Sequence, residues 1–336
     1  MEVKMKKIAF VIPYFGKFPE FFDIWLKTAN FNETIDFIFF TDIDFSLIKD
    51  VGKNIIVYNM SFDQIKNRIQ SLFDFDISLE RPYKLCDYKP AYGKIFENEL
   101  KEYDYWGHCD IDMVFGNIRK FVTDDLLDKC DRFHALGFFS IYKNNEKVNT
   151  IFKYHGTYPE LNYEDVFSTD KSCYFDEYRG MFSKTLCSHS TLYKSHIHRN
   201  PKQNRFLFYE LSIRKCNQFI LEWNNGNLYS INVETKEKEE ICYAHLFRRK
   251  FLILKNGNLN SFCIFPNKVV LGSNVENYMF LIKEKRFYRF EYMFSLLKKY
   301  IRNPFSYYKT KKFEKLSNEY NRKIKNKYNE YLIDEE

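Results

Sequence analysis

Residues Lys6 to Asp42 read KKIAFVIPYFGKFPEFFDIWLKTANFNETIDFIFFTD, and this stretch predicts a strand, a helix and a second strand. The apolar runs Lys6–Ile12 and Ile35–Phe40 have the length and composition of buried strands, and each ends at turn-forming or polar residues. Between them, Phe18–Ala29 carries apolar side chains at the spacing of an amphipathic helix. The chain therefore begins with alternating strands and helices.

The alternation continues to about residue 120. Strands are predicted at Asn54–Tyr58 and Tyr103–Cys109, and Ser61 is placed to cap a helix over Phe62–Leu72. A further helix, Ala91–Lys101, begins after a proline. This order predicts an α/β fold with a mostly parallel sheet and helices on both faces. The ligand crevice of such a sheet lies beyond the carboxyl ends of its strands, so the loops PYFG, TDID and HCDID are expected to meet in one cleft.

From about residue 120 to 280 the pattern is weaker. We expect an α+β portion there that shares the same sheet without a linker. Its predicted strands are Phe133–Tyr142, Leu228–Val233, Ile241–Leu246 and Lys268–Leu271.

Composition excludes several classes of protein. The eight cysteines among 336 residues form no CxxC pair, which argues against a disulfide framework or a zinc site and favours reduced thiols in the cytoplasm. No run of roughly 18 apolar residues is present to span a bilayer. The net charge of +7 resides in the C-terminal part, because residues 1–280 carry 37 basic and 37 acidic side chains.

The most informative motif follows the strand at 103–109 and reads Trp-Gly-His-Cys-Asp-Ile-Asp. Asp110 and Asp112 lie two positions apart, so on an extended segment both side chains address one site. Paired carboxylates suit Mg²⁺ or Mn²⁺, whose coordination is often completed by substrate phosphates. Such an ion neutralises charge on a departing diphosphate. The alternative interpretation is a solvated acidic turn.

A second candidate motif reads SLERPYKLCDYKPAYG. Arg81, Lys84 and Lys89 supply three cations within nine positions, interleaved with tyrosines on which a uracil ring can stack. These residues are candidates for binding a diphosphate. Asp87 is positioned either to orient a sugar hydroxyl or to pair with Lys89. The alternative is a surface loop whose lysines and tyrosines cover apolar area.

These motifs resemble the GT-A superfamily of glycosyltransferases, and specifically the bacterial enzymes that build capsular and other surface polysaccharides. The resemblance spans roughly residues 6–250. It rests on IPYFGKFPEFFDIWL, IDFIFFTD, SLERPYKLCDYKPAYG and YWGHCDIDMVFGNIRKF, and more loosely on CYFDEYRG and YAHLFRRK.

The resemblance implies a GT-A-like fold, a Rossmann-like mixed sheet flanked by helices, over residues 1–280. Residues 1–120 would bind the nucleotide sugar and residues 121–280 the acceptor. The implied activity is metal-dependent transfer of a sugar from a nucleotide diphosphate donor, with a UDP-sugar favoured. The implied acceptor is a surface polysaccharide or a lipid-linked glycan, and the implied cofactor is Mn²⁺ or Mg²⁺.

The resemblance also assigns roles around the nucleotide. Residues lining its pocket or lying near base and ribose are Pro13, Tyr14, Phe15, Thr41 and Asp42. Asp110 is matched to the ribose or the metal and Asp112 to the metal.

His245 matches the late histidine that completes metal coordination in GT-A enzymes, although a histidine among apolar neighbours is also typical of a satisfied core residue. Asp176 and Glu177 match the acidic motif that supplies the base in inverting members, and the alternative is a surface acidic pair. Adjacent residues of an extended chain point to opposite sides, so only one should reach the acceptor, and we favour Asp176.

Residues 281–336 are expected to form a basic, aromatic helical tail. Residues 281–327 carry 15 basic and 4 acidic groups among many aromatic and aliphatic side chains. This composition is typical of contact with an anionic membrane surface, and we expect a peripheral position on the inner face of the cell membrane. A helix docked on the body and a disordered end are the alternatives. No nucleic-acid motif accompanies the charge.

Two other function classes remain open from the sequence. One is a sugar-phosphate or other nucleotide-dependent transferase that uses the same metal. The other is a non-catalytic glycan-assembly protein that retains the fold.

Overall fold

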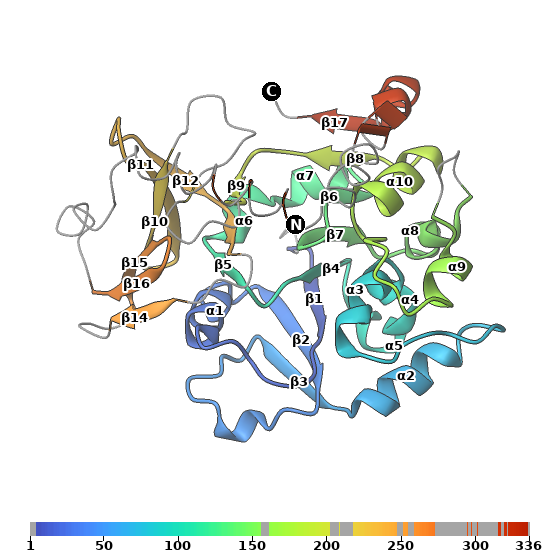
Figure 1. Cartoon of the computed structure of the whole chain (residues 1–336), viewed down its shortest axis with the longest axis horizontal. Coiled ribbons are helices and arrows are strands. Elements are labelled where there is room, and N and C mark those ends of the chain that lie inside the picture. The colour runs from blue at the N-terminus through green and yellow to red at the C-terminus, as the bar shows by residue number, and fades with distance from the viewer. Residues whose placement is uncertain are drawn as a thin grey trace.

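The fold is described from a computed structural model (Figure 1). The structure describes residues 5–155, 161–201, 208, 218–246, 251–254, 259–272, 294, 297, 301, 315, 316, 319, 320 and 322–334.

A mixed eight-stranded sheet forms the centre of the molecule, with strand order β17-β8-β6-β7-β4-β1-β2-β3. The four strands predicted in the first 110 residues are confirmed, and they pair in parallel. Their bounds are β1 (Ile8–Pro13), β2 (Ile35–Thr41), β3 (Ile55–Asn59) and β4 (Tyr105–Cys109). The apolar runs of β1, β2 and β4 are nearly unbroken because both faces of these strands are buried, whereas β3 at the edge of the sheet is only partly buried.

Helices cover both faces of this sheet, as predicted. On one face α1 (Phe22–Asn30) packs Trp25 into the core cluster that contains Phe10 of β1. On the other, α2 (Phe62–Gln70) packs against the cluster that contains the next strand residue, Val11. Alternate residues of one strand thus serve two cores.

The start of α2 confirms the predicted cap. The Ser61 hydroxyl accepts from the Gln64 backbone N–H at 3.2 Å, and the Gln64 side chain accepts from the Ser61 N–H at 2.7 Å. This capping box satisfies two helix-end donors and is worth about 1 kcal/mol.

The predicted helix Ala91–Lys101 is wrong as a continuous element. Two short helices replace it, α4 (Tyr92–Ile95) and α5 (Glu97–Leu100), and they follow the short turns η2 (Pro82–Lys84), α3 (Leu85–Tyr88) and η3 (Lys89–Ala91). Gly93 permits a close approach to the sheet, since a Cβ there would lie 2.6 Å from the Trp106 indole nitrogen. This series of short turns brings Lys89 to the carboxyl end of β4, beside Asp110.

The predicted strand Phe133–Tyr142 is two strands, β6 (Arg132–Leu136) and β7 (Phe139–Lys143). They pair antiparallel around a turn at Gly137, and β7 is also antiparallel to β4. Five of the seven pairings in the sheet are parallel and two are antiparallel. The sheet is therefore mixed, although mostly parallel as expected.

The expectation that residues up to 280 share one sheet is wrong for residues 219–271. Apart from residues 243–245, their strands form a separate six-stranded sheet at one side of the molecule (Figure 1), and its residues pack in a cluster that also contains Ile24 of α1. Its strands are β10 (Phe219–Asn224), β11 (Asn227–Asn232), β12 (Lys238–Ile241), β14 (Leu252–Leu254), β15 (Ser261–Phe265) and β16 (Lys268–Leu271). The turn Asn225-Gly226 has positive φ at both residues, which joins β10 and β11 into a local hairpin.

A third, three-stranded sheet pairs segments that are distant in sequence. It contains β5 (Met113–Phe115), β13 (Tyr243–His245) and β9 (His198–Arg199). The predicted strand Ile241–Leu246 is thereby divided, because Ile241 ends β12 and the next residues form β13.

The remaining elements are short. They are η1 (Phe45–Leu47), α6 (Ile118–Phe121), α7 (Asp124–Asp128), α8 (Glu146–Asn149), η4 (Ile151–Lys153), α9 (Tyr163–Phe167), η5 (Tyr178–Phe182), α10 (Ser183–Cys187), β8 (Leu192–Lys194), η7 (Asn329–Tyr331) and β17 (Leu332–Asp334).

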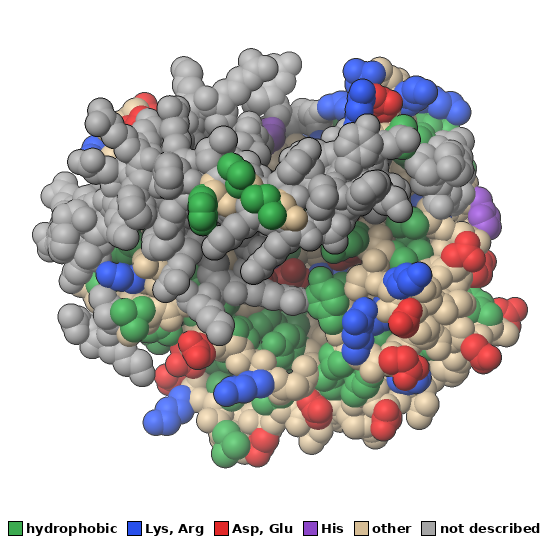
Figure 2. Space-filling model, in the orientation of Figure 1, with side chains coloured by type: hydrophobic (Ala, Val, Ile, Leu, Met, Phe, Trp, Pro, Cys, Tyr) green, Lys and Arg blue, Asp and Glu red, His purple; other side chains and the backbone are tan. Residues whose placement is uncertain are grey.

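The described C-terminal end packs against the body of the molecule. A docked tail was one of the alternatives left open by the sequence. β17 pairs in parallel with β8, and Ile324 is buried in a cluster with Leu186 and Leu192. Figure 2 shows basic side chains gathered over this segment, where Arg322, Lys323, Lys325 and Lys327 lie. Most of the predicted tail from residue 281 to 321 lies outside the described residues. No helix in the described part of the chain is long and apolar enough to cross a membrane.

Candidate metal centre in an acidic cleft

A cleft of 1120 Å³ opens at the carboxyl ends of β1 and β4, where the sequence placed it. The loops PYFG and HCDID both line it, and a third wall comes from residues 135–138 and 172–177. The TDID loop does not contribute, which corrects that part of the prediction.

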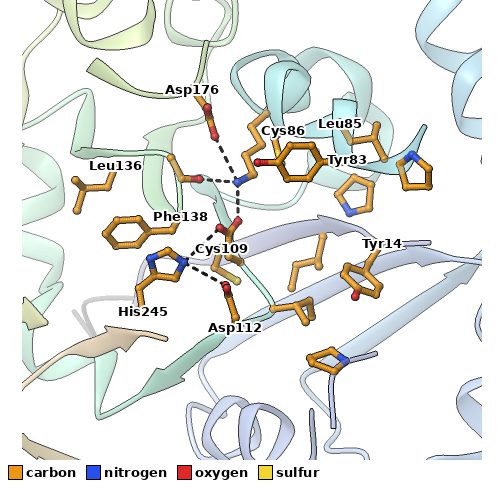
Figure 3. A pocket seen from close by; sticks show the side chains of 18 of the residues that line it. Tyr14, Tyr83, Leu85, Cys86, Cys109, Asp112, Leu136, Phe138, Asp176 and His245 are labelled. Carbon is orange, nitrogen blue, oxygen red and sulfur yellow. Dashed lines mark hydrogen bonds and ion pairs between the residues drawn. The ribbon is translucent and has the colours of Figure 1, made fainter. Parts of the chain in front are cut away.

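Asp110, Asp112 and His245 meet in this cleft (Figure 3). One ligand atom from each lies within 4.8 Å of the others. His245 Nε2 is 3.2 Å from Asp112 Oδ1 and 3.8 Å from Asp110 Oδ2. Two carboxylate oxygens and an imidazole nitrogen fit a divalent transition metal or, through the oxygens, Mg²⁺.

Strand pairing brings the three residues together. The two aspartates follow β4 and precede β5, while His245 ends β13, 133 positions further along the chain than Asp112. His245 lies opposite Met113 in the antiparallel β5–β13 pair, and the Leu246 N–H donates to the Asp112 carbonyl at 2.7 Å. The late histidine is thus fixed beside the aspartate pair by backbone hydrogen bonds.

Lys89 joins the aspartate pair to the opposite wall. Its ammonium lies 2.6 Å from Asp110 Oδ1, 2.6 Å from the Gly137 carbonyl and 3.4 Å from Asp176 Oδ2. Burial alone lowers a lysine pKa, but the charges of Asp110 and Asp176 raise the Lys89 pKa well above its ordinary value. Lys89 is therefore a fixed cation whose three donors face protein oxygens.

Asp176 is buried beside this ammonium. Burial raises the pKa of its carboxyl to about 7; Lys89 opposes the shift, and the charges of Glu177 and Asp110 add to it. A carboxylate with such a pKa is a competent proton acceptor near neutral pH.

A family model covers this whole site. The model of a family of unknown function, DUF6625, matches residues 10–273. The chain belongs to DUF6625. The matched segment contains both aspartates, His245, Lys89 and Asp176, and it ends before the predicted tail. No curated protein matches the chain.

In this DUF6625 chain, three of the five residues predicted to surround the nucleotide line the cleft and two do not. Pro13, Tyr14 and Phe15 line the cleft, as expected, and the Tyr14 ring stacks on Phe18 at 5.1 Å. The predicted places of Thr41 and Asp42 are wrong. Thr41 is fully buried and Asp42 lies outside the cleft lining, where it accepts the Gly16 N–H at 3.4 Å. Thr41 is the last residue of β2 and Asp42 follows it, and β2 lies on the side of β1 that faces away from β4.

Two of the three predicted diphosphate cations lie outside the cleft lining. Lys84 is buried outside the cleft lining, and its ammonium donates to Asp87, to the Val166 carbonyl and to the Lys171 carbonyl. Arg81 is exposed, also outside the lining, and donates to the Asp170 carbonyl. Lys89 lines the cleft but is engaged as described above.

Asp87 pairs with Lys84, not with Lys89. Its two oxygens also accept the backbone N–H groups of Cys173 at 2.9 Å and Phe175 at 3.1 Å. Although Asp87 contributes to the cleft wall, its oxygens hold the loop before Asp176. Its predicted contact with a sugar hydroxyl is therefore not supported.

Both Asp176 and Glu177 line the cleft, so the expectation that only one could face it is wrong. The chain is not extended here, because the Glu177 N–H donates to the Tyr174 carbonyl and Tyr174 has a φ of 57°. The turn places consecutive side chains on one side.

Four residues that the sequence did not single out support the site. Trp25 donates its indole N–H to the Asp110 carbonyl at 3.1 Å, and Phe138 stacks on His245 at 4.3 Å. Asn200 contacts His245, and Gly137 leaves room for Asp176, which a Cβ would approach to 2.7 Å. Only Gly137 carried a local signal, as a lone glycine within an apolar run.

Proposed function

We propose that this DUF6625 protein is a metal-dependent glycosyltransferase with a GT-A-like fold. It transfers a sugar from a nucleotide diphosphate donor, with a UDP-sugar favoured, to a surface-polysaccharide or lipid-linked glycan acceptor. The observation that carries the proposal is the cluster of Asp110, Asp112 and His245 in a large cleft at the carboxyl ends of parallel strands.

The charge of the cleft supports the metal requirement. Its described lining carries six acidic and two basic side chains, a formal excess of four negative charges. These residues are Glu20, Asp87, Asp110, Asp112, Asp176, Glu177, Lys17 and Lys89. An anionic diphosphate is repelled by such a surface. A divalent ion held by Asp110, Asp112 and His245 would act as a Lewis acid and neutralise charge on the diphosphate.

The cleft offers surfaces for both ends of a donor. Tyr14 and Phe18, both partly buried, supply aromatic area near β1, which suits a nucleobase. Asp176 and Glu177 lie on the other wall, where a carboxylate can accept the proton of an acceptor hydroxyl. Lys89 holds Asp176 and Asp110 at a fixed separation between these two ends.

A thermal-shift panel of UDP-, GDP- and CMP-sugars with and without Mn²⁺ tests the proposal. A ligand at one hundred times its Kd stabilises the folded state by about 2.7 kcal/mol. We expect one nucleotide class to raise Tm only when Mn²⁺ is present, and Asp112→Asn to abolish that shift while leaving the metal-free Tm unchanged.

Product analysis separates the alternatives. A glycosidic bond with release of the free nucleoside diphosphate supports glycosyl transfer, whereas a phosphodiester product identifies a sugar-phosphate transferase. Metal-dependent hydrolysis of the donor without acceptor excludes a non-catalytic protein. Wild-type turnover by a folded Asp112→Asn variant at saturating Mn²⁺ would overturn the proposed site.

The proposed acceptor suggests a place at an anionic membrane surface, on its cytoplasmic side. Phe294, Leu297 and Ile301 are 55%, 52% and 72% exposed, respectively, and their helical spacing of three and four places them on one face. They lie in the stretch 281–327 with its 15 basic and 4 acidic residues. Apolar contact and charge attraction therefore act together at such a surface.

A further inference from the structure

The His245 ring is held on two sides. One face stacks on the Phe138 ring, with centroids 4.3 Å apart and planes 16° from parallel. The edge that carries Nδ1 lies 3.2 Å from the side-chain oxygen of Asn200. The opposite edge carries Nε2 and faces the two aspartates (Figure 3).

The stack and the hydrogen bond constrain different things. Stacking fixes the plane of the imidazole, but a half-turn of the ring about the Cβ–Cγ bond preserves the stack and exchanges nitrogen for carbon at both edges. Polar partners at the two edges distinguish the orientations. Asn200 is the partner at the Nδ1 edge, and it lies at the cleft beside His245.

The same contact selects the tautomer. An amide oxygen accepts hydrogen bonds and does not donate them, so Nδ1 must carry the hydrogen that it shares with Asn200. In the neutral ring Nε2 then presents its lone pair toward Asp110 and Asp112. This is the tautomer that a metal ligand requires.

The aspartate side of the cluster is fixed independently. Lys89 binds Oδ1 of Asp110, and Oδ2 is the oxygen near His245. Trp25 holds the Asp110 carbonyl. On the imidazole side, the hydrogen bond to Asn200 is a contact that fixes the orientation of the ring.

We infer that Asn200 is a positioning residue of the metal centre, which selects the His245 orientation and tautomer that direct Nε2 between Asp110 and Asp112. The inference rests on the metal site of the proposed function. Outer partners of this kind typically contribute 10- to 100-fold in metal affinity.

Calorimetric titration of the full chain with Co²⁺ and, separately, Mg²⁺ tests this role. Co²⁺ binds imidazole well, whereas Mg²⁺ takes oxygen ligands. Asn200→Leu, which keeps the shape and removes the acceptor, should weaken Co²⁺ binding about 10- to 100-fold and leave Mg²⁺ binding unchanged. Asn200→Asp restores an acceptor and should retain wild-type Co²⁺ affinity or exceed it.

The outcomes are distinguishable. Equal Co²⁺ affinity of Asn200→Leu and the wild type overturns the role of Asn200 alone. Equal loss of Co²⁺ and Mg²⁺ also overturns it, because that result indicates a general structural effect. If the leucine variant does not fold, Asn200→Gln, which displaces the acceptor by one methylene, takes its place with the same expectation. Failure of the wild type to bind either ion overturns the metal site of the proposed function itself.

Discussion

Lys84 and Asp87 form an ion pair in which both side chains are almost fully buried, at 1% and 2% exposure. Every donor of the ammonium is used, and the carboxylate accepts two further backbone N–H groups from the loop at 173–175. A buried pair is tolerated only when its partners are satisfied in this way. Its structural consequence is to fasten the loop that carries Asp176 to the wall of the cleft.

Lys84→Met should therefore lower the free energy of unfolding by about 3–5 kcal/mol, because it leaves the Asp87 charge buried without its counterion. Urea unfolding measures the change. Lys66→Met is the matched control, since Lys66 pairs with the largely exposed Glu80 and its loss should cost less than about 1 kcal/mol. Equal effects of the two substitutions would contradict the structural role of the buried pair.

Asp176 makes the stability of the metal-free protein depend on pH. Its pKa in the folded state is about 7, above the ordinary carboxyl value of 3.8, so the folded protein binds one more proton than the unfolded chain between these limits. Stability should fall by about 1.4 kcal/mol per pH unit as pH rises through this window, and level off above pH 7.

Asp176→Asn removes this titration. The variant should gain stability relative to the wild type as pH rises from about 4 to 7, with no further gain above. Urea unfolding at several pH values in EDTA measures the difference. A difference that does not vary with pH would show that Asp176 titrates normally in the folded state.

At the level of single residues, the sequence was sufficient to predict the site residues that belong to a local motif. The spacing of Asp110 and Asp112 after a strand was sufficient to place both in the cleft. Asn200 had no such mark, because its role arises from a contact with His245 across 45 positions. Lys84 was misassigned because charge in a sequence does not reveal burial, and here the cation faces inward.

Secondary-structure elements were predictable where local periodicity determines them. The strands β1 to β4 and the helix α2 were recognised from apolar runs and a capping pattern. The β6–β7 hairpin was missed because its turn falls within an apolar run. Pairings between distant segments, such as β5 with β13 or β8 with β17, depend on tertiary packing that a single sequence does not encode locally.

The packing of the C-terminal segment leads to a prediction about stability. Ile324 is 3% exposed and packs against residues of α10 and β8. Ile324→Ala should lower the free energy of unfolding by about 2–4 kcal/mol, through lost burial and the cavity left behind. Leu316→Ala, at a nearby exposed position, should change it by less than about 0.5 kcal/mol. No loss of stability in the Ile324 variant would show that the segment does not dock in solution.

Across the whole molecule, acidic and basic side chains are unevenly distributed. The body has equal numbers of acidic and basic residues, yet the described cleft lining is strongly acidic. The basic excess lies after residue 280.

The proposed membrane surface depends on both the basic excess and the apolar stripe of Phe294, Leu297 and Ile301. Replacing all three by Ser should weaken binding to vesicles that contain phosphatidylserine at least about tenfold, because apolar burial is lost. Sedimentation with vesicles measures this. Leu47→Ser with Leu72→Ser, two exposed apolar positions on the body, should leave binding unchanged. High salt should weaken wild-type binding, since the charge contribution is screened. Equal binding to neutral phosphatidylcholine vesicles would contradict attraction by charge, and no binding to either vesicle would leave the exposed stripe without a membrane role.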